Sequence, residues 1–104
     1  MSKEKLKKSI RQAIANDPHK QDILKVSLFG SYAYGKPKPD SDVDILIEYR
    51  KDARIGFFEL LDTQYNIEKY LNKRVDLLTP SSLSHFFRDE VLRRAEKIYE
   101  QKQG

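Results

Sequence analysis

The sequence predicts an α/β (α+β) domain in which a small mixed β-sheet packs with helices. Segments whose apolar residues recur at helical spacing alternate with short runs rich in β-branched residues, in the order helix, strand, short helix, strand, helix, strand, helix. The chain has 104 residues, which is long enough for one modest hydrophobic core. We therefore expect residues 1–104 to form a single domain with two or three layers.

The first part of the chain predicts a helix, a strand and a short second helix. A lysine-rich segment carries apolar residues at helical spacing and ends near residues 16–18, which predicts an amphipathic first helix. The short, largely apolar run from Ile23 to Phe29 is typical of a buried strand, and Gly30 closes it. Ser31 then lies where a helix would be capped, and residues 32–35 allow one further turn.

The middle of the chain predicts a second strand and a third helix. Pro37 and Pro39 force an extended connection into a strand that runs from Asp42 to Tyr49. The next helix is predicted from six residues at helical spacing, which are Phe57, Leu60, Leu61, Gln64, Ile67 and Leu71.

The last part of the chain predicts a third strand and a final helix. The segment from Arg74 to Leu78 is typical of a short strand, which Thr79-Pro80 ends. The final helix is predicted because four apolar residues would share one of its faces, and these are Phe87, Val91, Ala95 and Ile98.

Composition excludes several classes of protein. Hydrophobic residues make up 38% of the chain, and their periodicity argues against disorder. Lys and Arg outnumber Asp and Glu by 20 to 16, an excess that favours anionic partners only weakly. Cysteine is absent, so disulfides and thiolate metal sites are excluded. No apolar segment is long enough to span a bilayer or to act as a signal peptide, and we expect a cytoplasmic location.

Two aspartates interrupt the apolar second strand. Because side chains alternate along a strand, Asp42 and Asp44 leave the same side of the sheet, with Cα atoms ~6.6 Å apart. Two anions this close repel each other and resist desolvation unless water or a cation lies between them. Asp76 lies between Val75 and Leu77, an inward-facing apolar pair, so it points away from them and could join the first two acids. Such an oxygen-rich set suits Mg²⁺ or Mn²⁺.

The Gly30-Ser31 pair predicts a phosphate site. A strand that turns directly into a helix presents free backbone N–H groups at the positive helix end, and glycine allows a phosphate to approach the backbone closely. Ser31 adds a hydroxyl donor. A phosphate cradle beside metal-binding carboxylates predicts a metal-nucleotide site with in-line displacement at phosphorus.

The spacing of these residues resembles a known signature. Gly30 and Ser31 are followed by ten residues and then by Asp42-Val43-Asp44, which is similar to the G-S-x10-D-x-D signature of the DNA polymerase β-like nucleotidyltransferase superfamily. Within it, the chain resembles the minimal nucleotidyltransferase (MNT) domains that are antitoxins of HEPN ribonuclease toxins. Asp76 falls where these domains carry a third carboxylate. The resemblance covers nearly the whole chain and implies the polymerase β-like nucleotidyltransferase fold.

The resemblance implies a magnesium-dependent enzyme that transfers AMP from ATP to a hydroxyl group of a partner protein. The expected acceptor is a tyrosine of a cognate HEPN toxin, which makes the chain an antitoxin. Asp42 and Asp44 would bind two Mg²⁺ ions, and Asp76 would ligate one of them and accept or orient the proton of the attacking hydroxyl. Gly30 and Ser31 would hold the triphosphate of ATP.

Two other functions stay open. Many members of the family that the chain resembles carry arginine in the segment after Gly-Ser, where this chain has Tyr32 and Tyr34. The chain could therefore instead be an antitoxin that neutralises its toxin by occlusion. A transferase acting on a small molecule or an RNA end is disfavoured, because in a chain of this length we expect no further substrate-binding domain. We expect no membrane association and no direct nucleic-acid binding. The sequence leaves open the partner's identity, the number of AMP units added and whether the chain forms a homo- or hetero-oligomer.

Overall fold

A computed structural model describes residues 2–102 of the chain. The elements are α1 (Lys3–Ala15), η1 (Lys20–Asp22), β1 (Ile23–Phe29), α2 (Ser31–Tyr34), β2 (Val43–Tyr49), α3 (Phe57–Leu71), β3 (Val75–Leu78), η2 (Pro80–Ser82), α4 (Arg88–Arg94) and β4 (Glu96–Glu100), where η marks a short 3₁₀ helix. Among the described residues, every helix is too short or too polar to cross a membrane.

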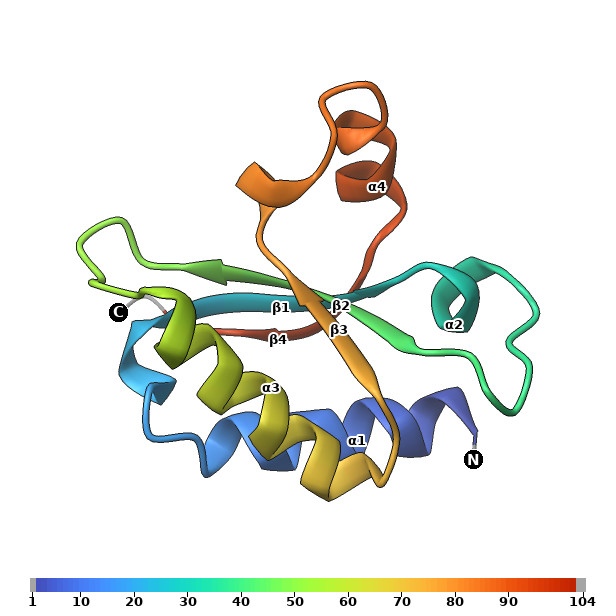
Figure 1. The fold of residues 1–104 in the computed structure, drawn as a ribbon, viewed down its shortest axis with the longest axis horizontal. Helices are drawn as coiled ribbons and strands as arrows, with labels where there is room; N and C mark the ends of the chain where they lie inside the picture. Colours follow the sequence, from blue (N-terminus) through green and yellow to red (C-terminus); the bar gives the residue numbers. More distant parts are fainter. Residues whose placement is uncertain (1, 103–104) are drawn as a thin grey trace.

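The four strands form one mixed sheet in the order β3-β2-β1-β4. Strand β1 pairs with β2 and with β4 in antiparallel fashion, whereas β2 and β3 are parallel. Helices α1 and α3 cover one face of this sheet, and the segment that contains η2 and α4 rises from the other face (Figure 1). The small mixed sheet packed with helices that the sequence predicts is therefore confirmed.

The main hydrophobic core lies between the sheet and the two long helices. Helix α1 buries the four residues that its periodicity predicts, which are Leu6, Ile10, Ala13 and Ile14. Ile67 of α3 and Ile45 of β2 are fully buried in the same cluster. A smaller cluster on the opposite face of the sheet contains Phe29, Leu46, Leu83 and Val91. Each face of the sheet thus has its own apolar contacts, and the smaller cluster anchors α4.

The predicted final helix is wrong beyond Arg94. Helix α4 ends there, Ala95 adopts an extended conformation, and residues 96–100 form the edge strand β4. Ile98 is buried as expected, but in the main core and from a strand. The apolar spacing of this segment fits a helix, yet the second edge of β1 needs backbone hydrogen-bond partners, and β4 supplies them.

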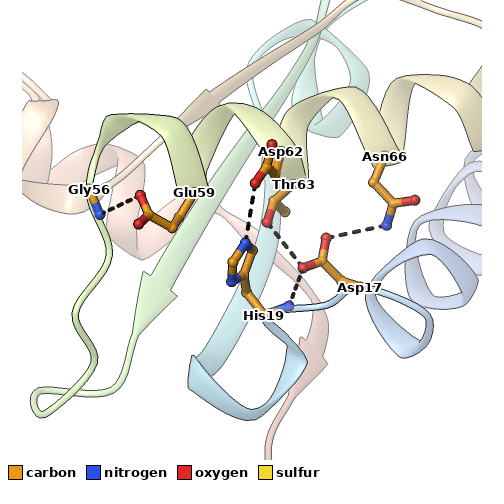
Figure 2. Close-up of polar contacts among 7 residues, drawn as sticks. All are labelled: Asp17, His19, Gly56, Glu59, Asp62, Thr63 and Asn66. Carbon is orange, nitrogen blue, oxygen red and sulfur yellow. Dashed lines mark hydrogen bonds and ion pairs between the residues drawn. The ribbon is translucent and has the colours of Figure 1, made fainter.

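Buried Asp17 ties the end of α1 to α3. This residue is only 5% exposed. Its Oδ1 accepts hydrogen bonds from the backbone N–H of His19 (2.8 Å) and from the Thr63 hydroxyl (3.2 Å). Its Oδ2 accepts one from the Asn66 amide (3.2 Å). Figure 2 shows these contacts, which link the chain entering β1 to the helix above it. The cluster lies at the end of β1 opposite to Gly30.

Candidate active site

The sheet register brings the predicted acidic residues to one end of the sheet. Asp44 of β2 lies beside Asp76 of the parallel strand β3 and opposite Phe29 of the antiparallel strand β1. Val43 and Ile45 point into the main core, so Asp44 projects from the other face, as the alternation predicts. Asp42 precedes β2, which begins at Val43 and not at Asp42 as predicted. The fold therefore places all three carboxylates near the point where β1 ends.

Asp44 is the most buried of the three carboxylates. Asp42 and Asp76 are exposed, whereas Asp44 is half-buried. Burial raises the pKa of Asp44 above its ordinary value of 3.8, and the negative charges of Asp76 and Asp42 raise it further. A cation bound here would offset both effects, because it restores favourable interactions to a desolvated carboxylate and screens the repulsion between the acids.

The three carboxylates do not converge on one point. Across residues 2–102, no group of three or more His, Cys, Asp or Glu side chains is gathered closely enough to hold a metal ion. Asp42 Oδ1 instead lies 3.8 Å from Arg74 Nε in an exposed ion pair, a weak contact that a divalent cation can replace. The donor chemistry fits Mg²⁺ or Mn²⁺, since all three side chains offer carboxylate oxygens. Coordination of one ion by all three requires a side-chain rearrangement.

Gly30 makes room for Asp44. Its backbone has φ 71° and ψ −153°, a conformation that residues with a side chain rarely adopt. A Cβ atom at this position would collide with the Asp44 carboxylate. Glycine is therefore required for two reasons, because it permits the turn after β1 and because it allows a half-buried acid to lie against the backbone.

The turn into α2 differs in detail from the prediction. Ser31 is the first residue of α2, and Gly30 occupies the cap position, so the predicted cap at Ser31 is wrong by one residue. The backbone N–H groups of Ala33 and Tyr34 both donate to the Gly30 carbonyl at 3.1 Å. The N–H groups of Ser31 and Tyr32 belong to the first turn, where the helix itself supplies no acceptor.

The residues that follow Ser31 point in different directions. Tyr32 packs against the main core and so does not line the acidic face. Lys36 and Lys38 are exposed in the connection to β2. Tyr34 is 39% exposed, and the Arg94 guanidinium of α4 lies over its ring, 4.0 Å from the centroid. Sequence reasoning did not predict this contact, because it assigned Arg94 to a longer final helix.

Sequence comparison finds relatives across most of the chain. The family model described as "Polymerase beta, Nucleotidyltransferase" matches residues 8–104. The protein adenylyltransferase MntA of Thermococcus cleftensis is 38% identical over 78 residues, which are 74% of this chain and 74% of that protein. A relative from Methanocaldococcus jannaschii is 36% identical over 79 residues, which are 76% of this chain and 83% of that protein.

Solved structures share the fold. A crystal structure of a toxin-antitoxin pair with AMP-PNP superposes with a TM-score of 0.72 at 20% identity, covering 92% of this chain and 74% of the matched one. A tri-AMPylated HEPN toxin of Shewanella oneidensis in complex with its MNT antitoxin gives a TM-score of 0.67 at 17% identity, covering 95% and 73%. Fold, register and sequence agree: the chain belongs to the polymerase beta nucleotidyltransferase family.

Proposed function

We propose that this chain transfers AMP from ATP to a hydroxyl group of a partner protein. The observation that carries the proposal is the contact between Asp44 and the Gly30 turn. A half-buried carboxylate lies directly against a glycine that opens a helix, and a second carboxylate, Asp76, is its neighbour in the sheet. This arrangement suits the joint binding of a divalent metal and a phosphate chain.

The carboxylates would hold the metal. Asp42 and Asp44 are the proposed ligands of two Mg²⁺ ions, and Asp76 is the proposed third ligand of one of them. Bound Mg²⁺ supplies charge neutralisation at the phosphates and lowers the pKa of the attacking hydroxyl. Asp42 has to leave Arg74 to take part, which the exposed, 3.8 Å ion pair permits at little cost.

The remaining residues would orient the substrate. The Ser31 hydroxyl and the first-turn N–H groups donate to the triphosphate, and the lack of a side chain at Gly30 lets it approach. Asp76 accepts or orients the proton of the acceptor hydroxyl. The acceptor oxygen forms a bond to the α-phosphorus of ATP. At the same time, the bond breaks between that phosphorus and the oxygen that joins it to the β-phosphorus. Pyrophosphate leaves with the electron pair of the broken bond.

The proposed acceptor is a tyrosine of a HEPN-type toxin, which would make this chain an antitoxin. Support comes from the named activity of the MntA relative and from the AMPylated toxin in complex with an MNT antitoxin of the same fold. We also propose that the chain acts in the cytoplasm, where ATP and Mg²⁺ are both present. The prediction of a single domain over residues 1–104 stays a prediction.

Neutralisation by occlusion is the second candidate. One observation favours it, because the three carboxylates are not gathered into a metal site and Asp42 faces Arg74. An occluding antitoxin needs surface complementarity and no chemistry, so one antitoxin molecule is needed for each toxin molecule. A catalytic antitoxin can modify many toxin molecules in turn, so a substoichiometric amount is enough.

The test is to mix a candidate HEPN-type partner from the same organism, in excess, with a trace of this protein, ATP and Mg²⁺, and to weigh the partner by intact-mass spectrometry. We expect most partner molecules to gain at least one adenylyl group. Asp76→Asn should lower the transfer rate about 10²–10⁴-fold while partner binding persists. Asp52→Asn, which changes an exposed acid beyond the far end of β2, is the matched control. An unchanged partner mass together with stoichiometric neutralisation would establish occlusion and refute the transferase.

A further inference from the structure

Arg94, from an element that lies far away in the sequence, contacts the short helix that follows the proposed phosphate turn. Its guanidinium carbon is 4.0 Å from the centroid of the Tyr34 ring, in the helix that Gly30 opens. We propose that Arg94, held by Tyr34, binds the outer phosphates of ATP, the two that leave as pyrophosphate. This inference rests on the proposed function and adds a specificity-determining residue to it.

The fold fixes Arg94 on the correct side of the sheet. Helix α4 is anchored by Val91, which packs with Phe29 and Leu46 on the face from which Asp44 projects. Arg94 ends the helix, and the chain then turns into β4, where Glu96 pairs with Leu28. Leu28 is two residues before Gly30, so both ends of this connection are tied to the strand that leads into the proposed phosphate turn. In Figure 1, β4 runs from α4 back along β1.

The contact with Tyr34 leaves donors of Arg94 for an anion. The guanidinium carries five N–H donors, and an aromatic ring attracts its charge without accepting hydrogen bonds from all of them. One of these nitrogens, Nη1, lies 3.2 Å from Glu90 Oε1, one helical turn earlier. The Arg94 side chain is still 46% exposed. Donors therefore remain for a phosphate, and the ring restricts where the guanidinium can move.

Glu96, two residues after Arg94, is held by lysines of α1, so Glu90 remains the acid that pairs with Arg94. Glu96 lies 2.9 Å from Lys7 Nζ and 3.0 Å from Lys3 Nζ. Hydrogen bonds from these two lysines lower the pKa of Glu96, so its charge is satisfied from the α1 side. Lys3 also donates to the Ala33 carbonyl of α2 at 2.7 Å. The lysines hold α2 and β4 together on one side, and Arg94 stays directed toward Tyr34 on the other.

A purely structural role would make Arg94 a link between α4 and α2. The two roles differ in what they predict for Arg94 and for the ring that it contacts. A phosphate-binding arginine affects ATP and leaves AMP unchanged, because AMP lacks the outer phosphates, and loss of Arg94 then weakens MgATP binding more than loss of the Tyr34 ring. A structural link would be broken alike by removal of Arg94 or of the ring, so the two variants would weaken nucleotide binding equally.

The experiment measures binding of MgATP and of AMP to the full chain by isothermal titration calorimetry, with thermal unfolding of each variant recorded in parallel. Arg94→Ala should raise the Kd for MgATP about tenfold and leave the Kd for AMP within about twofold, as expected for loss of one charge-assisted contact. Arg93→Ala removes the adjacent, exposed arginine of the same helix and should change neither value. Arg94→Lys keeps the charge but loses the planar guanidinium with its several donors, and an intermediate effect is expected.

A second pair of variants tests the ring, and it also applies if Arg94→Ala fails to fold. Tyr34→Phe keeps the aromatic ring that contacts Arg94 and should bind MgATP as the wild type does. Tyr34→Leu removes this ring and should weaken MgATP binding about threefold. Equal MgATP affinity in Arg94→Ala and wild type, equal loss of ATP and AMP, or equal effects of Tyr34→Phe and Tyr34→Leu would each overturn the inference. If the wild type binds MgATP through Asp44 while Arg94→Ala has no effect, only this inference fails. If the wild type does not bind MgATP, the proposed function fails as well.

Discussion

At the scale of single residues, Gly30 and Asp44 form one unit. The carboxylate of Asp44 occupies the space that a side chain at residue 30 would need, and Gly30 has a positive φ of 71°. A substitution at Gly30 therefore acts on the proposed metal ligand as well as on the approach of the phosphate. Sequence reasoning assigned only the second effect to this glycine.

Gly30→Ala is expected to impair metal binding even without nucleotide. The added methyl group displaces the Asp44 carboxylate, and we expect a loss of metal affinity of at least the about 10–100-fold that follows when the groups orienting a metal ligand are removed. Mn²⁺ binding measured by calorimetry, with and without ATP, checks this. Ser31→Ala is the matched control, because it removes a hydroxyl donor at a cost of about 1–3 kcal/mol in ATP binding and leaves Mn²⁺ binding alone unchanged. Wild-type Mn²⁺ affinity in Gly30→Ala would contradict the proposed role of Asp44.

Asp44→Asn is expected to stabilise the metal-free protein at neutral pH. Burial first, and then Asp76 and Asp42, raise the pKa of Asp44 in the folded state above its ordinary value of 3.8. Between pH 3.8 and the raised pKa, the folded state therefore holds a proton that the unfolded chain has already lost. The resulting stability is fully present below pH 3.8 and is lost as the pH rises through the raised pKa.

Urea unfolding in EDTA between acidic and neutral pH measures this effect. The free energy of unfolding of Asp44→Asn should exceed that of the wild type above the raised pKa, and the difference should shrink as the pH falls. Added Mg²⁺ should stabilise the wild type and not the variant, because the ligand binds only the folded carboxylate site. A variant that is less stable than the wild type at neutral pH would point to a structural role for Asp44.

At the scale of elements, side chains distant in sequence decide how helices and strands are joined. Asp17 links the end of α1 to α3, and it does so as a buried acid surrounded by donors. Neither Thr63 nor Asn66 can be recognised from the sequence as its partner, since the periodicity of α3 shows only which face is buried. The proposed active site lies at the other end of β1, so this link should serve stability alone.

Asp17→Ala is expected to lower the free energy of unfolding by about 3 kcal/mol, because the Thr63 hydroxyl and the Asn66 amide lose a buried acceptor. Asp17→Asn keeps one acceptor oxygen and should cost about half as much. Asp62→Ala changes an exposed acid whose contact with His19 is 3.5 Å long, and it should cost under about 0.5 kcal/mol. Urea unfolding measures all three. A loss below about 0.5 kcal/mol for Asp17→Ala would contradict this account of the cluster in Figure 2.

At the scale of the whole molecule, one face of the sheet carries the main hydrophobic core and the other face carries the proposed active site. Helices α1 and α3 cover one face and bury the main core, whereas the other face carries Asp44, Asp76 and the smaller cluster beneath α4 (Figure 1). A macromolecular acceptor has to approach from the face with the carboxylates. Helix α4 rises from that face and contacts α2 through Arg94 and Tyr34, so the proposed phosphate contact of Arg94 would lie on the face that the acceptor approaches.

Local sequence is enough to predict the α/β order as far as α4, the buried faces of β2 and β3 and the side from which Asp44 leaves the sheet. These features follow from backbone geometry, since alternation along a strand and helical spacing depend only on neighbouring residues. The spacing from Gly30-Ser31 to Asp42 and Asp44 likewise indicates nucleotidyl transfer, because the signature depends only on positions along the chain.

The remaining features depend on which distant segments meet in the folded chain. The pairing of Asp76 with Asp44, the collision that keeps residue 30 a glycine and the contact of Arg94 with Tyr34 all join residues from different elements. The strand β4 is the clearest case. Its residues have helical apolar spacing, but the unpaired edge of β1 offers backbone hydrogen bonds that only the folded sheet presents, and these override the local pattern.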